Sequence, residues 1–146
     1  MKTILALTGI LIFTNVIGQN LNEHRWKHRI LIIQASDDLS DKYRDQLREF
    51  NDVDKELKER KLVVYTIVGD KYKVMNYQSK ISDNSWQPTS GLFGDLLDND
   101  YDFRVILIGL DGGVKLEKTT VLTRKELFNI IDSMPMRMNE LRKNRK

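Results

Sequence analysis

The sequence predicts an α/β layered domain built on a mixed central sheet, and three observations indicate this class. Two apolar runs rich in β-branched residues, at positions 29–34 and 62–68, enclose a long segment with helical periodicity. A third apolar run, at 103–109, precedes an Asp-Gly turn and an alternating strand, as in a hairpin. A helical pattern with a recognisable start follows from position 123. A strand–helix–strand unit joined to an antiparallel hairpin is typical of layered α/β domains.

The first strand and the first helix follow directly from residue pattern. Residues 29–34, RILIIQ, contain three isoleucines and predict a buried strand. Ser36, Asp37 and Asp38 come next, and their short polar side chains can accept hydrogen bonds from the free N–H groups of a helix start. We predict one helix over residues 39–60, because apolar side chains recur there at steps of three and four. This stripe consists of Leu39, Tyr43, Leu47, Phe50, Val53 and Leu57.

The middle of the chain is less regular. Residues 62–68, LVVYTIV, predict a second strand, which ends at Gly69 and Asp70. Residues 70–90 are polar with scattered aromatic side chains, so we expect irregular or short strand structure there. Residues 92–97 predict a short helix.

The third strand opens a hairpin. Residues 103–109, FRVILIG, are apolar nearly throughout, which predicts a strand in the centre of the sheet. Positions 111–113, Asp-Gly-Gly, form the turn. Residues 114–119 then alternate, with Val114 and Leu116 expected on one face.

The last helix has an explicit start and an explicit stop. Thr123 and Glu126 have the T-x-x-E spacing of a capping box. Pro135 stops or kinks the helix, because proline lacks an N–H group and disfavours helix for the preceding residue. Leu127, Ile130, Ile131 and Met134 form its core stripe. The complete order of elements is also that of the thioredoxin-like arrangement, which is one candidate among several.

The two ends of the chain stand apart from this domain. Residues 1–18 combine an early lysine, an apolar run too short to span a bilayer comfortably, and small residues before a cleavage point after Gly18. They predict a signal peptide, with an uncleaved anchor as the alternative. We expect 19–25 to form a flank, 26–142 the domain and 143–146 a basic tail. Cleavage would leave an exported chain, periplasmic or secreted, without a transmembrane segment.

Composition excludes several functions. The 24 basic and 21 acidic residues are interspersed over most of the chain, so we expect no nucleic-acid partner. The chain contains no cysteine, which excludes a thiol nucleophile, a CxxC redox pair and a thiolate metal site. The core must therefore hold the fold without disulfides, and we expect no cofactor.

Three stretches resemble one known family. They are WKHRILII at 26–33, LIGLDGGVKL at 107–116 and LFNIIDSMPMR at 127–137. In this order they are similar to the DUDES family, catalogued as domain of unknown function 4174. The resemblance covers about residues 26–142, and the chain departs from the family's usual lysine at Leu110.

The resemblance implies a thioredoxin-like fold near the peroxiredoxins. Animal members are extracellular-matrix domains, including those of the sushi-repeat proteins, and bacterial members are small exported proteins. No enzyme activity is established for the family, so no catalytic residue carries over. The place of a reactive thioredoxin cysteine corresponds to residues 35–38, and the place of its cis-proline to residues 99–102. Neither cysteine nor proline stands there.

Glu23, His24 and His28 come nearest to a metal site. The two histidines have i,i+4 spacing, which presents two nitrogens on one side of a helix. His28 adjoins a predicted strand, however, and a zinc site needs a third ligand. We therefore favour a solvated flank over a metal site.

Two further clusters have a structural and a functional interpretation. Asp37, Asp38 and Asp41 could bind a hard cation or act in acid–base chemistry, but we favour helix capping as their role. Positions 111–113 with Lys115 could suggest a phosphate loop. A phosphate loop of that type opens a helix, whereas these glycines open a strand, so we favour a hairpin turn.

The segment DSMPMR, residues 132–137, is the most distinctive stretch. Its structural interpretation is a built kink, with Asp132 or Ser133 capping a last short helix and methionines filling the irregular space. Its functional interpretation is an adaptable contact surface of Met136, Arg137 and Met138. Arg137 would then be either paired with Asp132 or directed outward.

The sequence as a whole predicts an exported, cysteine-free, thioredoxin-like domain that acts as a non-catalytic binding module. Its partner would be an envelope or extracellular protein. The alternative is an enzyme of envelope stress derived from peroxide- or thiol-handling relatives. The candidate interaction residues are Asp111, Gly112, Gly113, Asp132, Met134, Pro135, Met136 and Arg137.

Overall fold

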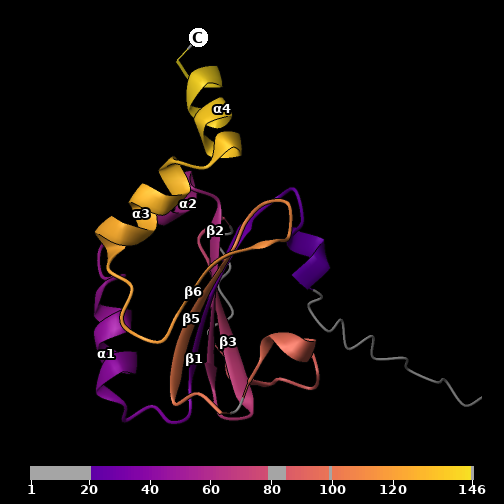
Figure 1. The fold of residues 1–146 in the computed structure, drawn as a ribbon, viewed down its shortest axis with the longest axis vertical. Coiled ribbons are helices and arrows are strands. Elements are labelled where there is room, and N and C mark those ends of the chain that lie inside the picture. Colours follow the sequence, from indigo (N-terminus) through magenta and orange to yellow (C-terminus); the bar gives the residue numbers. More distant parts are fainter. Residues whose placement is uncertain (1–20, 79–84, 99, 146) are drawn as a thin grey trace, which may run out of the picture.

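A six-stranded mixed sheet forms the centre of the molecule (Figure 1). The computed structural model describes residues 21–78, 85–98 and 100–145. The strands lie in the order β4-β3-β2-β1-β5-β6. They are β1 Arg29–Ala35, β2 Leu62–Val68, β3 Lys71–Asn76, β4 Gln87–Pro88, β5 Phe103–Ile108 and β6 Val114–Lys118. The helices are α1 Asp41–Arg48, α2 Asp54–Glu59, α3 Arg124–Asp132 and α4 Pro135–Lys143, with 3-10 turns η1 Leu21–His24 and η2 Gly94–Leu96.

The sheet is mixed because the two strands beside β1 run in opposite directions. It pairs parallel with β2 and antiparallel with β5. The chain then adds β3 to β2 and β6 to β5 as antiparallel hairpin partners. Every residue of β1 and β5 is buried, and so is all of β2 except Val68. The three predicted apolar strands are confirmed, including the interior position of β5.

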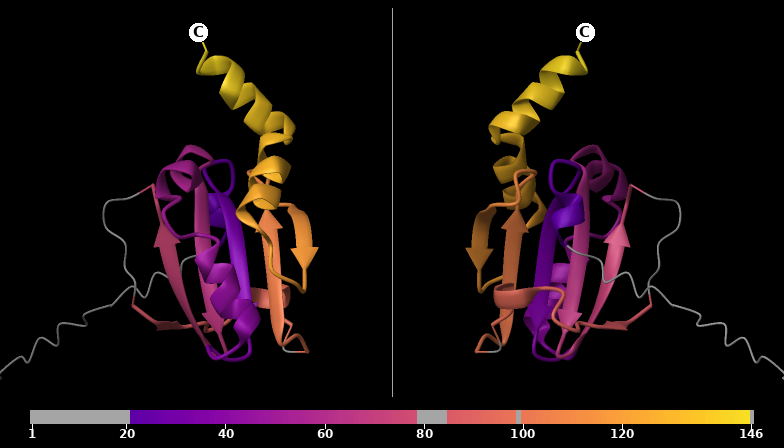
Figure 2. Two further views of the ribbon diagram at one scale, coloured as in Figure 1. Left: turned by 90° about the vertical axis from the view of Figure 1, so that its left-hand side faces the viewer. Right: turned by 90° about the vertical axis from the view of Figure 1, so that its right-hand side faces the viewer.

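The two faces of the sheet are covered differently (Figure 2). Helices α1, α2 and α3 lie on one face, whereas η1 and η2 lie on the other. Successive residues of a strand point to opposite faces, so Leu31 and Ile33 of β1 pack toward the helices. Ile30 and Ile32 pack toward the 3-10 turns. We expected helices on the faces of the sheet, and among the described residues α1, α2 and α3 all pack on one of these faces.

The predicted single helix over residues 39–60 is two helices. It is interrupted after α1, and Asp52 adopts a left-handed φ of 59° that a right-handed helix cannot contain. Leu39 precedes α1 and is 75% exposed, so it does not belong to the stripe. Phe50 and Val53 lie in the break and are nevertheless buried. The apolar stripe identified the core contacts correctly but did not identify the break.

The hairpin of β5 and β6 contains an irregularity that the alternating pattern does not predict. Leu107 pairs with Leu116 and Ile108 with Val114, with a register shift between the two pairs. Because Leu107 and Ile108 face opposite sides of the sheet, Val114 and Leu116 do too. Their expected placement on one face is wrong. Val114 is left 50% exposed.

Where the structure describes residues 70–90, they form short strands, which is one of the two outcomes expected. Gly69 and Asp70 form a tight turn that pairs Val68 with Lys71, and β3 continues from it as a strand of six residues. The part of this segment at 79–84 lies outside the described residues. The short helix expected at 92–97 is the 3-10 turn η2.

The structure describes part of each end of the chain. The predicted signal peptide, residues 1–18, lies outside the described residues. Part of the expected flank forms η1, and Leu21 packs against the core on that face of the sheet. Helix α4 continues to Lys143, beyond the expected domain end. Across residues 21–78, 85–98 and 100–145, no helix is both long enough and apolar enough to cross a membrane.

Candidate functional site

The DSMPMR segment is the junction between α3 and α4. Helix α3 ends at Asp132, and Pro135 occupies the first turn of α4, where its missing N–H costs nothing. The N-cap of α4 is Met134, without a side-chain hydrogen bond, so capping by Asp132 or Ser133 is wrong. The Ser133 hydroxyl donates instead to the Ile130 carbonyl at 2.7 Å. The predicted kink itself is confirmed.

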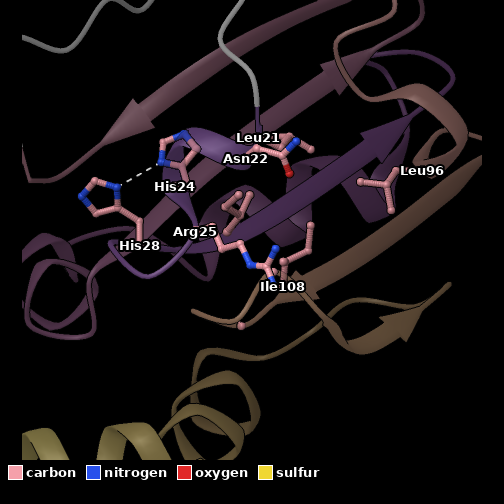
Figure 3. A pocket seen from close by; sticks show the side chains of 10 residues that line it. Leu21, Asn22, His24, Arg25, His28, Leu96 and Ile108 are labelled. Carbon is pink, nitrogen blue, oxygen red and sulfur yellow. Dashed lines mark hydrogen bonds between the residues drawn. The ribbon is translucent and has the colours of Figure 1, made fainter.

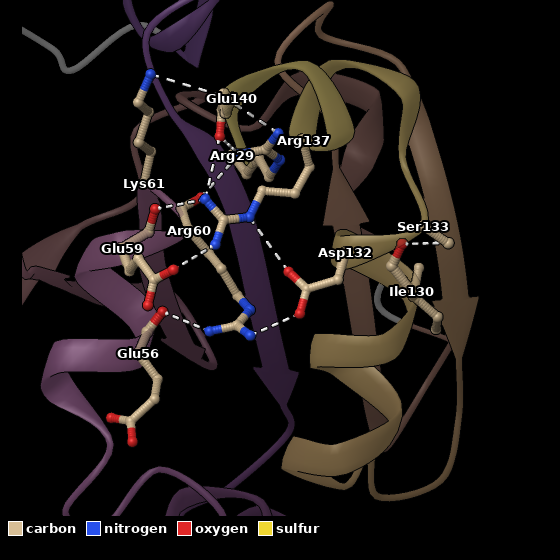
Figure 4. Close-up of polar contacts among 10 residues, drawn as sticks. All are labelled: Arg29, Glu56, Glu59, Arg60, Lys61, Ile130, Asp132, Ser133, Arg137 and Glu140. Atoms are coloured by element: carbon tan, nitrogen blue, oxygen red, sulfur yellow. Dashed lines mark hydrogen bonds and ion pairs between the residues drawn. The ribbon is translucent and has the colours of Figure 1, made fainter. Parts of the chain in front are cut away.

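Arg137 closes this junction from inside (Figure 4). It is 2% exposed. Its Nη2 lies 2.8 Å from Glu59 Oε1 on α2, and its Nε lies 3.2 Å from Asp132 Oδ1. Its Nη1 donates to the Glu59 carbonyl and lies 3.4 Å from Glu140 Oε2. Of the two alternatives for Arg137, the structure shows the inward one.

Glu140 joins the same network to the central strand. Arg29 begins β1 and is 0% exposed, and its Nη1 lies 3.4 Å from Glu140 Oε2. Arg60 reaches Asp132 at 2.6 Å, and Lys61 reaches Glu140 at 3.6 Å. We call Arg29, Glu59, Asp132, Arg137 and Glu140 the clamp. It fastens α4 to β1 and to α2.

The clamp sets the pKa values of its arginines in opposite directions. Burial disfavours the charge of Arg137, but hydrogen bonds to Glu59, Asp132 and Glu140 outweigh burial and raise its pKa. Burial lowers the pKa of Arg29, with Glu140 opposing the shift only in part. The roles of Arg29, Glu59 and Glu140 could not be identified from the sequence. Arg137 and Glu59 are 78 residues apart, and Arg29 and Glu140 are 111 residues apart, so no local sequence pattern indicates that they are partners.

The hairpin turn at 111–113, which is the tip of the β5–β6 hairpin, is held by hydrogen bonds from Gly113 and Lys115 to the Asp111 carboxylate. Gly112 has a φ of 82°, a conformation that glycine adopts readily. Asp111 Oδ1 accepts from the Gly113 N–H at 3.0 Å, and Asp111 Oδ2 lies 2.7 Å from Lys115 Nζ. The hydrogen bond from Lys115, followed by that from Gly113, lowers the pKa of Asp111. The predicted turn is confirmed, and Lys115 serves to hold its carboxylate.

The N-terminal turn packs against this tip. The Trp26 N–H donates to the Leu110 carbonyl at 2.6 Å. Trp26 has a left-handed φ of 67° and is 60% exposed. The Arg25 guanidinium lies 5.5 Å from the centre of its ring, and the Arg25 stem lies against Gly112. We call Arg25, Trp26 and residues 110–113 the tip surface, which unites two of the three stretches behind the family resemblance.

A small pocket lies beneath the tip surface (Figure 3). Its volume is about 110 Å³, and residues of η1, β5 and η2 line it, among them Leu21, Ile108 and Leu96. His24 and His28 stand at one side, with their Nδ1 atoms 3.0 Å apart. This volume suits water molecules or a very small ligand.

His24 is not part of a solvated flank. Its Nε2 lies 2.8 Å from the hydroxyl of Tyr65, a residue of β2 that is 0% exposed. Burial, then the neighbouring His28 and Lys27, lowers the pKa of His24 to about 4. Burial also lowers the pKa of His28. Both imidazoles are therefore neutral at pH 7, and the expectation of a solvated flank is wrong for His24.

A wider cleft lies where β1 and β2 end. Its volume is about 380 Å³, and it is lined by Ser36, Asp37, Asp38, Val68, Asp70, Lys71 and Trp86. In α/β sheets this edge is a usual place for ligands. Asp37 already accepts a hydrogen bond from the Leu39 N–H at 2.8 Å, whereas Asp41 pairs with Arg44 on α1. The N-cap of α1 is Ser40, without a side-chain hydrogen bond, so the capping role favoured for Asp37 and Asp38 is wrong, whereas Asp41 does lie in the first turn of α1.

No site within the part of the chain that the structure describes combines three or more metal-ligating side chains. The fold and these surfaces define a small cysteine-free α/β domain with an exposed tip and an internally clamped last helix. The chain belongs to the family described as Domain of unknown function (DUF4174), whose model matches residues 20–140. The family predicted from the three stretches is thereby confirmed. No curated protein and no solved structure matches the chain.

Proposed function

We propose that this chain is an exported, non-catalytic interaction domain, and that its tip surface contacts a protein partner outside the cytoplasm. The observation that carries the proposal is Trp26. A large aromatic side chain stands 60% exposed on a left-handed backbone, fixed by the Leu110 carbonyl. The predicted signal peptide supports export.

The left-handed backbone conformation of Trp26 is energetically unfavourable. A left-handed conformation costs an L-residue roughly 1–2 kcal/mol. Such strain persists where the surroundings impose it, and strained residues gather at functional sites. The N–H groups of Lys27 and His28 both donate to the His24 carbonyl, at 2.9 and 2.8 Å, so the turn is fixed on both sides of Trp26.

An exposed aromatic side chain on a fixed backbone turn is suited to binding. Tryptophan and arginine are enriched among the residues that dominate interface energies. Preorganisation reduces the entropy lost on association, so a backbone turn that is already formed favours binding. Arg25 beside Trp26 adds a donor for a partner's carboxylate. The candidate residues Asp111, Gly112 and Gly113 form the floor of this surface.

The thioredoxin-like fold is part of the proposal. The β-α-β unit of β1 and β2 and the β-β-α unit of β5, β6 and α3 share one sheet, in the order expected of that fold. The position of its reactive cysteine falls at the edge cleft, where Asp37 and Asp38 stand. A peroxide- or thiol-handling enzyme would need another redox group, because the chain has no cysteine.

The test compares the two tryptophans of the chain. Trp26→Ala removes the proposed contact, and Trp86→Ala removes a ring that is 44% exposed on the cleft. Each variant, checked for folding by circular dichroism, serves as bait in an envelope or extracellular fraction. We expect a partner captured by wild type and by Trp86→Ala to be lost with Trp26→Ala. Equal capture by all three proteins would contradict the proposal.

A further inference from the structure

The imidazole rings of His24 and His28 meet head-on at one side of the pocket beneath the tip surface (Figure 3). Their Nδ1 atoms lie 3.0 Å apart, and His24 Nε2 lies 2.8 Å from the Tyr65 hydroxyl on β2. Hydrogen bonds therefore run from the sheet through His24 to His28. We propose that these bonds form a pH switch, which holds the N-terminal turn, residues 21–28, on the sheet at neutral pH and releases it in mild acid. The inference rests on the proposed function, because release of the turn would displace Trp26 and so dissociate the partner.

The geometry of the pair allows only one proton between the two rings. At 3.0 Å, the Nδ1–H of one ring donates to the lone pair on Nδ1 of the other. When both rings are protonated, both Nδ1 atoms carry N–H groups, so no acceptor remains between them. Two positive charges would then also adjoin each other. A singly protonated pair keeps its hydrogen bond, so it is the second proton that breaks the contact.

The surroundings of the pair disfavour protonation while the turn is closed. Burial, followed by His28 and Lys27, lowers the pKa of His24 to about 4, and burial, Lys27 and Lys61 lower the pKa of His28. The charged and titratable groups around the pair are Glu23, Arg25 and Lys27 of the turn, Lys61 before β2, which pairs with Glu140, and Tyr65 of β2. Cations prevail near the imidazoles, so a released turn accepts protons more readily than a closed one.

The hydrogen bonds of the turn allow it to move as a unit. The N–H groups of Arg25, Lys27 and His28 all donate to carbonyls within the turn. The bond from the Trp26 N–H to the Leu110 carbonyl and the bond between His24 and Tyr65 attach the turn to the sheet. Loss of the second bond therefore weakens the attachment without unfolding the turn itself.

The size of the effect follows from the two protonation equilibria. In the released turn a histidine regains its ordinary pKa of 6.5, whereas His24 in the closed turn has a pKa of about 4. Because the released state binds protons more tightly, acid favours release. His24 alone should raise the equilibrium constant for release about 20-fold from pH 7 to pH 5. His28, whose pKa is also lowered, adds to this increase.

The test is amide hydrogen exchange of the purified protein at pH 7 and pH 5, resolved by residue with NMR and corrected for the intrinsic effect of pH. We expect the protection of the Trp26 N–H to fall by at least about 20-fold between these pH values. It should also stay below the protection of the Leu107 N–H in β5 at both. Equal protection of Trp26 and Leu107 would mean that the turn opens only when the domain unfolds. That result, or protection of Trp26 that does not change with pH, would overturn the proposal.

Substitutions assign the effect to the pair. His24→Gln removes the group with the largest pKa shift and should abolish most of the fall in Trp26 protection. Glu23→Gln, on the same turn, is the matched control and should keep the wild-type fall. A wild-type fall in His24→Gln, or its loss in Glu23→Gln, would contradict the assignment. If His24→Gln does not fold, His28→Gln removes the other half of the pair and is judged in the same way. The exchange measurement needs no partner, so it can fail while the Trp26→Ala capture experiment still supports the proposed function.

Discussion

The clamp and the tip surface each include residues from the stretches that identify the family, yet those side chains are used in opposite ways. In the clamp, the Arg137 side chain points inward and is 2% exposed, and Arg29 is 0% exposed, so α4 is fastened through two arginines that solvent barely reaches. The tip surface turns Trp26 outward until it is 60% exposed, on a strained backbone. A motif can therefore mark a structural junction as readily as a binding surface, and burial distinguishes the two.

The same contrast appears within one type of interaction. Asp111 and Lys115 form an ion pair at 2.7 Å whose side chains are 43% and 34% exposed. Arg137 and Asp132 form an ion pair at 3.2 Å in which the arginine is almost fully buried. Solvent screens the first pair, whereas removing Arg137 from the second takes a buried cation out of a network in which Asp132 keeps its pair with Arg60. Distance alone would have ranked the two pairs in the wrong order.

The largest expected effect is that of Arg137→Ala. The variant leaves Glu59, Asp132 and Glu140 without a shared cation and should lower the free energy of unfolding by about 3 kcal/mol. The matched control is Arg142→Ala, on the same helix, which makes no ion pair within the described residues. It should change stability by less than about 0.5 kcal/mol. Urea unfolding of both variants measures the difference. Equal losses of unfolding free energy would mean that the clamp does not stabilise the fold.

The second largest effect is expected from acid, which should lower the free energy of unfolding through protonation of His24. His24 has a folded-state pKa of about 4, against 6.5 for a free histidine, and it faces His28, Lys27 and the Tyr65 hydroxyl. The unfolded chain therefore binds more protons between these values, and the free energy of unfolding falls as pH drops from about 6.5 to 4. Urea unfolding at several pH values should show a shallower loss for His24→Gln. Identical pH profiles would mean that His24 is not buried as described.

A smaller effect is expected from Trp26→Gly. Glycine adopts the left-handed φ of 67° without strain, which offsets the lost contacts of the partly exposed ring. Stability should remain within about 1 kcal/mol of wild type, by urea unfolding. Capture of the partner should nevertheless be lost. A large destabilisation would show that Trp26 is a packing residue.

The smallest effect is expected from Lys115→Ala. Its exposed ion pair with Asp111 should contribute no more than about 0.5 kcal/mol to stability. The Gly113 N–H still holds the Asp111 carboxylate and keeps the turn in place. Thermal unfolding at low and high salt measures this contribution. A loss comparable to that of Arg137→Ala would place the hairpin tip among the structural junctions.

The sequence pattern predicted the sheet because a buried strand is recognisable from a short run of consecutive apolar residues. The runs at 29–34, 62–68 and 103–109 needed no distant partner to be recognised, and Thr123 does accept a hydrogen bond from the Glu126 N–H at 3.2 Å. The break between α1 and α2 was missed, because an apolar stripe continues across a left-handed residue such as Asp52. Periodicity reports which side chains face the core and not whether the backbone between them is helical.

The functional surfaces were predictable only in part. The Asp-Gly-Gly turn was visible, but its neighbour Trp26 was not, because 84 residues separate Trp26 from Leu110, its hydrogen-bond acceptor. His24 and His28 were identified by their spacing and dismissed for want of a third ligand. Tyr65, which orients His24, could not be found from the sequence. Sites assembled from distant strands leave no local pattern.

The most direct test of this contrast is one urea titration series that compares Arg137→Ala with Trp26→Ala. Each variant truncates one large side chain from a stretch that identifies the family. The account predicts that Arg137→Ala loses about 3 kcal/mol of unfolding free energy and Trp26→Ala less than about 1 kcal/mol. Equal losses, or a greater loss for Trp26→Ala, would contradict it, because the tip would then be a structural element like the clamp.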